Sequence, residues 1–361
     1  RKQIFEFAES ELLAIENELK APGTNEYGRV DRVAGWFLLA RMYLNAQTWI
    51  NENKYQEAYT YATKVIADGH YPLASDYREI FLADNNTCKE IIWPLVQDGL
   101  RAQSSAGTNF YVKAFVNGPM DELYKTGVGS RGWGNVRAKV SLVDAFDADD
   151  VMFDGNDTWG NNKKDKRAQF MTALPNQVKD TWDVNMDMTS TFTCGYGYIK
   201  WRNVTKEDEL SASGDAYTSI DFPLFRTADA YLMAAEAILR GASGTQSEAL
   251  GYVNEVRTRA YMSGKYAKSG VRSDVSGEIG ANELDLDFLL LERQKELASE
   301  LIRRTDLIRF GKYTKGNNWD WKNGVRLGED VDDKYNLFPI PESELTNNPT
   351  LVQNDGYKVI K

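Results

Sequence analysis

The spacing of apolar residues constrains this chain most, because it follows the helical period in two regions and loses it between them. Each region alternates apolar helical stripes with short polar connections, as helical hairpins do. The predicted helices cover about residues 1–20, 30–50, 55–68, 228–239, 249–260 and 288–302. Gly69 is predicted to end one of them, and Asp285 or Asp287 to cap another at its N-terminus.

Residues 95–225 separate the two helical regions and are rich in Gly, Asn, Asp, Thr and aromatic residues. Without helical periodicity, this composition indicates loops and a few short strands. We therefore predict a mostly α fold, in which tetratricopeptide-like helical hairpins pack against an irregular, loop-rich region. The predicted parts, integrated in one domain, are residues 1–94, 95–225 and 226–361.

Charge and composition exclude several classes of function. The formal net charge is −10, and Lys and Arg form no basic run, so we expect no binding to nucleic acid. No stretch approaches the roughly 20 apolar residues that span a bilayer. His70, predicted at the surface, is the only histidine, and Cys88 and Cys194 are the only cysteines. We expect no metal centre and no cofactor, and leave open whether the cysteines pair.

Motifs in the C-terminal region carry a family resemblance. Residues 225–237 (FRTADAYLMAAEA) precede NEVRTRA at 254–260, ERQKEL at 292–297 and RTDLIR at 304–309. FPIP follows at 338–341. Their order and combination resemble the SusD/RagB family, the surface glycan-binding lipoproteins of Bacteroidetes.

The resemblance implies a binding protein and not an enzyme. Its ligand would be an oligosaccharide or polysaccharide, with starch-type α-glucan as our first expectation. The implied partner is a SusC-like TonB-dependent outer-membrane transporter. The implied location is the cell surface at the outer membrane, held by a lipid anchor that we expect outside this sequence.

Charged residues in the family motifs admit two interpretations. Arginine–carboxylate pairs between packed helices would fix the helix register, whereas a glycosidase needs two carboxylates across a sugar cleft. No motif selects such a catalytic pair, so we favour the structural interpretation. The residues concerned are Arg226, Asp229, Glu236, Arg257, Arg259, Glu292, Arg293, Glu296, Asp306 and Arg309.

A sugar offers apolar C–H faces that stack on aromatic rings, and hydroxyls that bind amide or charged groups. The irregular region places such residues side by side in three short segments. The predicted ligand-binding residues are Asn109, Tyr111, Arg131, Trp133, Asn135 and Trp159. Alternatively, each ring anchors its loop on the core.

Two further alternatives stay open. The helical hairpins can serve as a protein-interaction scaffold without a sugar site. Exposed, roughly coplanar rings on one surface would favour glycan binding, and buried rings would favour the scaffold. An acidic stretch offers oxygen ligands for Ca²⁺, but its spacing is not that of an EF-hand, and we interpret it as a solvated loop. Its residues are Asp147, Asp149, Asp150, Asp154, Asn156 and Asp157.

Overall fold

The computed structural model forms two compact units, residues 1–300 and 301–361. The boundaries predicted after residues 94 and 225 fall inside the first unit and remain a sequence-based division. The residues that the structure describes are 1–116, 125–151, 163–171, 196–262, 275–316, 319, 322–325 and 328–358.

Helices dominate the described residues, and strands are short, as predicted. The α-helices are α1 Lys2–Ile15, α2 Arg32–Ile50, α3 Tyr55–Asp68, α4 Thr108–Ala114, α6 Val140–Val143, α7 Ala148–Val151, α8 Thr227–Leu239, α9 Gln246–Met262, α10 Leu286–Leu297, α11 Arg303–Arg309 and α12 Glu342–Asn347. The strands are β1 Ile91–Leu95, β2 Phe170–Met171, β3 Gly197–Tyr198 and β4 Phe222–Arg226. Short 3₁₀ helices cover Tyr77–Phe81, Asn85–Thr87, Gly129–Arg131, Lys322–Gly324 and Asp333–Asn336.

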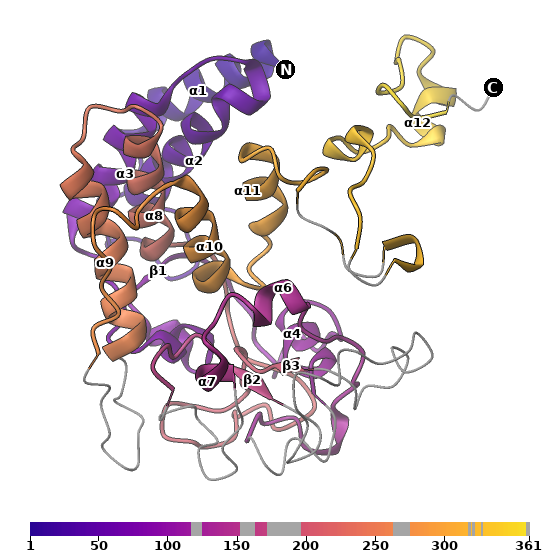
Figure 1. Ribbon diagram of the computed structural model, residues 1–361. Coiled ribbons are helices and arrows are strands. Elements are labelled where there is room, and N and C mark those ends of the chain that lie inside the picture. Colours follow the sequence, from indigo (N-terminus) through magenta and orange to yellow (C-terminus); the bar gives the residue numbers. More distant parts are fainter. Residues whose placement is uncertain are drawn as a thin grey trace. The chain divides into compact units, whose positions relative to one another are not determined.

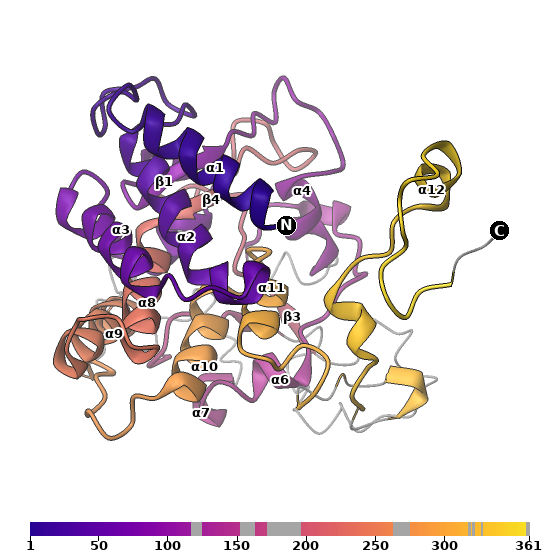
Figure 2. The same cartoon turned by 90° about the horizontal axis from the view of Figure 1, so that it is seen from above.

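The first unit contains a layer of stacked helices in which α2 packs on α3, α3 on α8 and α8 on α9 (Figures 1 and 2). Ala58 and Ala62 on α3 are fully buried, as are Ala234 and Ala237 on α8. All four belong to one apolar cluster. Small side chains let helix backbones approach closely, so this alanine-rich contact sets the stacking of the two hairpins.

The helix ends follow local chemistry. Asp31 caps α2, because one carboxylate oxygen accepts hydrogen bonds from the Val33 and Ala34 amides. Asp285 caps α10 by accepting a 2.7 Å hydrogen bond from the Phe288 amide, which decides between the two predicted caps. Gly69 ends α3 with φ of 78°, as predicted.

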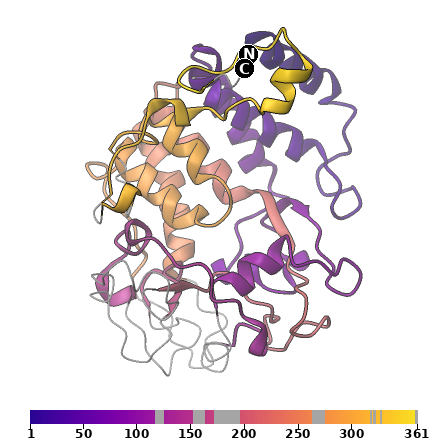
Figure 3. The ribbon, with the colours of Figure 1, turned by 90° about the vertical axis from the view of Figure 1, so that its right-hand side faces the viewer.

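The irregular region lies at one side of the helical layer, with α4, α6, α7, β2 and β3 (Figures 1 and 3). Strands β1 and β4 pair antiparallel, and so do β2 and β3. Beneath α4, Trp201 stacks on Phe222 at 5.5 Å between ring centroids. These two rings belong to an apolar cluster with Val112, which holds α4 against the rest of the first unit.

Two predicted helices are shorter than the pattern indicated: α1, predicted over residues 1–20, ends at Ile15, and α10 also ends early. We predicted residues 288–302, but α10 ends at Leu297, and Ser299 adopts a positive φ of 58°. Beyond this end, the Ala298 carbonyl accepts a 2.7 Å hydrogen bond from the Lys200 ammonium. The Glu300 carboxylate accepts 2.6 and 2.8 Å bonds from Arg226. Because the helix ends at Leu297, the residues that follow it can supply hydrogen-bond acceptors to the buried cations Lys200 and Arg226.

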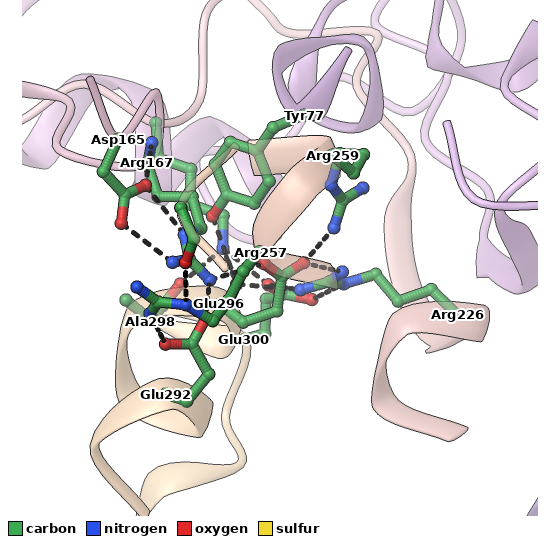
Figure 4. A network of polar contacts seen from close by, with 12 residues as sticks. Tyr77, Asp165, Arg167, Arg226, Arg257, Arg259, Glu292, Glu296, Ala298 and Glu300 are labelled. Carbon is green, nitrogen blue, oxygen red and sulfur yellow. Dashed lines mark hydrogen bonds and ion pairs between the residues drawn. The ribbon is translucent and has the colours of Figure 1, made fainter. Parts of the chain in front are cut away.

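A buried charge cluster joins the irregular region to the helices (Figure 4). Arg167 lies in the irregular region and binds Glu292 and Glu296 of α10, while Arg226 of β4 binds Glu296 and Glu300. The charge cluster is defined as the cations Arg167, Lys200, Arg226, Arg257 and Arg259 with the carboxylates Glu90, Asp165, Glu292, Glu296 and Glu300.

Electrostatics inside the charge cluster favour the ionised state of Glu296. Burial alone would raise the pKa of Glu296, but Arg259, Arg226 and Arg167 outweigh burial and hold this pKa well below its usual range. Burial lowers the pKa of Lys200 to about 8. Thus the family-motif charges form the structural pairs predicted from the sequence.

Two other motif carboxylates extend this pattern. Asp229 of α8 binds Arg293 of α10 at 2.8 Å. In the second unit, Asp306 and Arg309 pair at 2.7 Å within α11, because a spacing of three residues puts both on one helix face.

The second unit folds around an arginine of α11. The Arg304 guanidinium lies 4.9 Å from the centroid of the Tyr313 ring and 4.2 Å from that of Phe338. It also donates a 2.9 Å hydrogen bond to the Tyr335 carbonyl. These contacts tie α11 to the chain that follows it.

Candidate functional site

Helix α4 positions the first aromatic residues of the candidate site. Val112 points into the core, with 1% of its surface exposed. On the N-terminal side, the Thr108 hydroxyl donates a 2.7 Å hydrogen bond to the Ile220 carbonyl. Because the helix is anchored in this way, Phe110 stays at the surface, 42% exposed.

Residues 133–136 complete the C-terminal end of α4. The last carbonyls of a helix lack partners within the helix. Here the Trp133 amide donates to the Lys113 carbonyl, and the Asn135 amide donates to the Ala114 carbonyl, both at 2.8 Å. Gly134 adopts φ of 59°, a conformation that favours glycine. The loop that carries Trp133 is therefore held against α4 by its backbone.

The two segments bring Phe110 and Trp133 together at the surface. Their ring centroids lie 6.2 Å apart, and their planes are inclined by 58°. Trp133 is 37% exposed. We call this pair the aromatic platform. Both rings are exposed, as the glycan-binding interpretation expects, but they are tilted and not coplanar, contrary to that expectation. A ligand that fits both rings must therefore change direction between them.

Phe110 was missed as a binding residue, although it lies between two predicted ones. Its two neighbours sit deeper. The half-buried Tyr111 ring packs 5.4 Å from Trp201 and 5.7 Å from Phe222, and burial raises its pKa. Asn109 is only 2% exposed and donates a 3.0 Å hydrogen bond to the Ser104 carbonyl. The structure therefore places Phe110, and not Asn109, at the surface.

The polar side chains predicted beside Trp133 are accessible. Asn135 is exposed, and its side chain has no hydrogen-bond partner among the described residues. The exposed Arg131 donates a 3.0 Å hydrogen bond from Nε to the Asp215 carboxylate. Trp159 lies outside the described residues. The structure thus brings Arg131, Trp133 and Asn135 onto one loop beside the platform.

The Lys113 side chain ties a further segment to this site. Its ammonium donates to the Ala216 carbonyl and lies 5.8 Å from the centroid of the Tyr217 ring. Lys113 is 4% exposed, and burial lowers its pKa, as does the charge of Arg131. This buried cation holds residues 215–217 beside the platform.

Other features of the described residues do not suggest another kind of site. No group of His, Cys, Asp and Glu there is arranged to hold a metal ion. In the acidic stretch, Asp150 is buried and accepts hydrogen bonds from the Lys164 and Asp165 amides. Asp147 is exposed, and the side chain of Asp149 is not described. Asp154, Asn156 and Asp157 lie outside the described residues. The predicted solvation of the stretch therefore does not hold for Asp150, whose carboxylate holds the 163–165 turn.

Three further features concern the membrane, the histidine and the cysteines. None of the helices in the described part combines the length and apolar character needed to cross a membrane. His70 is exposed, as predicted, and its Nδ1 lies 2.9 Å from the Asp68 carboxylate. Cys88 is a buried free thiol whose pKa burial raises to about 12, and Cys194 lies outside the described residues.

Comparison with known proteins identifies the family. A sequence profile of the SusD family matches residues 89–357, about three quarters of the chain. The chain belongs to the SusD family. It is 32% identical to the starch-binding protein SusD of Bacteroides thetaiotaomicron, over 99% of this chain and 66% of that protein.

Other SusD-family relatives are more distant. The SusD-like protein P25 of Formosa agariphila is 25% identical over 91% of this chain and 59% of its own length. The chain thus spans about two thirds or less of these two curated relatives. The starch-binding protein SusD carries the name of a binding protein and not of an enzyme, in agreement with the sequence prediction.

Solved structures share the SusD fold with this chain. A SusD-like protein from Bacteroides fragilis superposes with a TM-score of 0.68 at 22% identity, covering 99% of this chain and 71% of its own. Surface glycan-binding protein A from B. thetaiotaomicron, in complex with laminarihexaose, gives 0.62 at 21% identity, covering 96% and 70%. These likenesses confirm the predicted mostly helical fold class.

Proposed function

We propose that this chain binds oligosaccharides at the aromatic platform without chemically altering them. The observation that carries the proposal is the exposed pair of Phe110 and Trp133 rings, 6.2 Å apart, with Arg131 and Asn135 accessible beside them. Exposed rings supply stacking faces, and the polar groups supply hydrogen bonds to hydroxyls. The names of the relatives, which include starch-binding and glycan-binding proteins, support it.

Within this proposal, a helical glucan of the starch type is the preferred ligand. The two platform rings are inclined by 58°, so they suit successive sugars whose faces turn along the chain. A flat β-1,4-linked ribbon presents its sugar faces in parallel planes and fits this tilt poorly. The name of the starch-binding relative points the same way.

The proposal extends to the setting of the protein. We infer a location at the cell surface on the outer membrane and delivery of the bound sugar to a SusC-like TonB-dependent transporter. Both inferences rest on the family resemblance. Isolating a tagged form of the full-length protein from outer membranes tests the partnership, because a stable complex would bring such a transporter with it.

Affinity electrophoresis through gels that contain starch, β-glucan or xylan tests the binding function. Retardation of the wild-type chain by starch, abolished in Trp133→Ala and weakened in Phe110→Ala, is the expected result. Trp49→Ala is the matched control, because Trp49 has a similar exposure of 41% on helix α2 of the helical layer. No retardation by any polymer would favour the protein-interaction scaffold.

A further inference from the structure

An exposed ion pair next to the aromatic platform joins two distant parts of the chain. Arg131 and Asp215 are 84 residues apart in sequence, and their contact is a 3.0 Å bond from Nε to Oδ1. The two side chains are 57% and 40% exposed. Exposed pairs of this kind contribute little to folding stability, typically below about 1 kcal/mol. Stability alone gives little reason for this arrangement.

Both side chains of the ion pair retain groups that can form further hydrogen bonds. Among the described residues, Nε is the only side-chain nitrogen of Arg131 with a partner, and Oδ1 is the only side-chain oxygen of Asp215 with one. Both terminal nitrogens of the guanidinium can still donate, and Oδ2 can still accept. A donor and an acceptor therefore sit side by side and accessible, which is what two neighbouring sugar hydroxyls require.

Three local features hold this pair in place. Gly129 has φ of 53°, and a Cβ at that position would lie 2.9 Å from Asp215 Oδ2, so glycine lets the carboxylate lie against the 129–131 turn. The buried Lys113 ammonium holds the Ala216 carbonyl. The Lys113 carbonyl accepts the Trp133 amide. One residue thus supports both the Asp215 segment and the platform.

The pair is within reach of a sugar on the platform. Arg131 and Trp133 are two residues apart, so their Cα atoms lie within about 7 Å of each other. A sugar stacked on the Trp133 ring directs its hydroxyls outward around its edge, where a long arginine side chain can meet them. The backbone supports described above fix this geometry before the ligand arrives, which reduces the entropy lost on binding.

We propose that Asp215 and Arg131 together bind two adjacent hydroxyl groups of the sugar that stacks on Trp133, with Asp215 as the acceptor. This inference rests on the proposed glycan-binding function and adds Asp215 as a residue that determines specificity. The ligand class is a glycan with an unsubstituted vicinal diol. No covalent step is involved.

The experiment measures binding of soluble starch, β-glucan and xylan to the wild-type chain and to the Asp215→Ala, Asp215→Asn and Trp133→Ala variants by affinity electrophoresis. We expect a roughly tenfold loss for Asp215→Ala, the size of one hydrogen bond to a charged group. A smaller loss is expected for Asp215→Asn, which keeps one acceptor oxygen. Glu26→Ala is the matched control, because Glu26 and Arg29 form an exposed pair through Nε at 2.9 Å.

The possible outcomes separate the two proposals. If starch binds, Trp133→Ala abolishes binding and Asp215→Ala binds like the wild type, the role of Asp215 is refuted while the binding function stands. If no glycan binds the wild type, both proposals fall. Thermal unfolding of Asp215→Ala should match that of the control, and a large drop in its midpoint would assign Asp215 to folding instead.

Discussion

Replacing Glu296 by glutamine removes one charge from the centre of the charge cluster with little change of shape. The Glu296 carboxylate binds Arg226 at 2.6 Å and Arg167 at 3.2 Å, and it also binds Arg259. All four side chains are almost fully buried. The substitution therefore leaves cations in the interior that have lost part of their compensating charge, without access to water.

The size of the effect follows from this burial. Removing one partner of a buried ion pair typically costs 3–5 kcal/mol, because the charge that remains is neither solvated nor compensated. We expect Glu296→Gln to lower the free energy of unfolding by about 4 kcal/mol at pH 7. Urea titration followed by tryptophan fluorescence measures this value. Glu6→Gln is the control, because Glu6 and Lys2 are 3.8 Å apart and more than half exposed, and it should unfold like the wild type.

The cost should depend on pH through Lys200. The charge cluster contains five cations and five carboxylates, so the loss of Glu296 leaves one cation in excess. Burial lowers the pKa of Lys200 to about 8, below its usual 10.5, so at pH 9 the folded protein can release this proton and restore the balance. The destabilisation should thus be smaller at pH 9 than at pH 7. A loss below about 1 kcal/mol at pH 7, or a larger loss at pH 9, would refute this reasoning.

Three further predictions concern folding. Asp31→Ala removes the α2 cap and should lower the free energy of unfolding by about 1–2 kcal/mol in urea titrations, while an unchanged midpoint would contradict the capping role. Burial raises the pKa of Asp229, but Arg293 and Arg41 outweigh it and lower this pKa to about 2 from 3.8. The unfolded chain therefore binds more protons between these values, and about 2 kcal/mol of stability should be lost as the pH falls from about 4 to 2. Asp229→Asn should flatten this part of the stability profile, and an unaltered slope would exclude Asp229 as its source. Gly127→Ala should lower the midpoint of thermal unfolding, because φ of Gly127 is 77° and the added Cβ would lie 2.5 Å from a backbone oxygen. Gly251→Ala is the control and should not lower it, because a Cβ at this position of α9 would meet no atom within 4 Å.

The helical regions could be predicted from the sequence. Apolar residues at helical spacing predicted α2, α3, α8 and α9 closely, because this pattern reports which face of a helix meets the core. Helix-capping residues such as Asp285 and Gly69 could also be predicted, because a cap contacts only the end of the helix beside it in the sequence. The family motifs also indicated that their charges pair within the structure.

Which side chains contact each other depends on the tertiary fold. Periodicity predicted α10 up to residue 302, but the helix ends at Leu297, because Lys200, about one hundred residues earlier, binds the carbonyl and carboxylate groups beyond that point. Likewise, the Glu296 carboxylate forms ion pairs with three arginines that come from three separate segments of the chain. Interactions between distant segments leave no periodic signal in the sequence.

The candidate site divides in the same way. The sequence singled out Trp133 with its polar neighbours, because glycines and amides beside an aromatic residue are a local pattern. It could not tell that Asn109 is buried while Phe110 is exposed, nor that Asp215 meets Arg131 from a segment 84 residues away. Exposure depends on what packs against a residue, and that is settled only when distant segments of the chain come together.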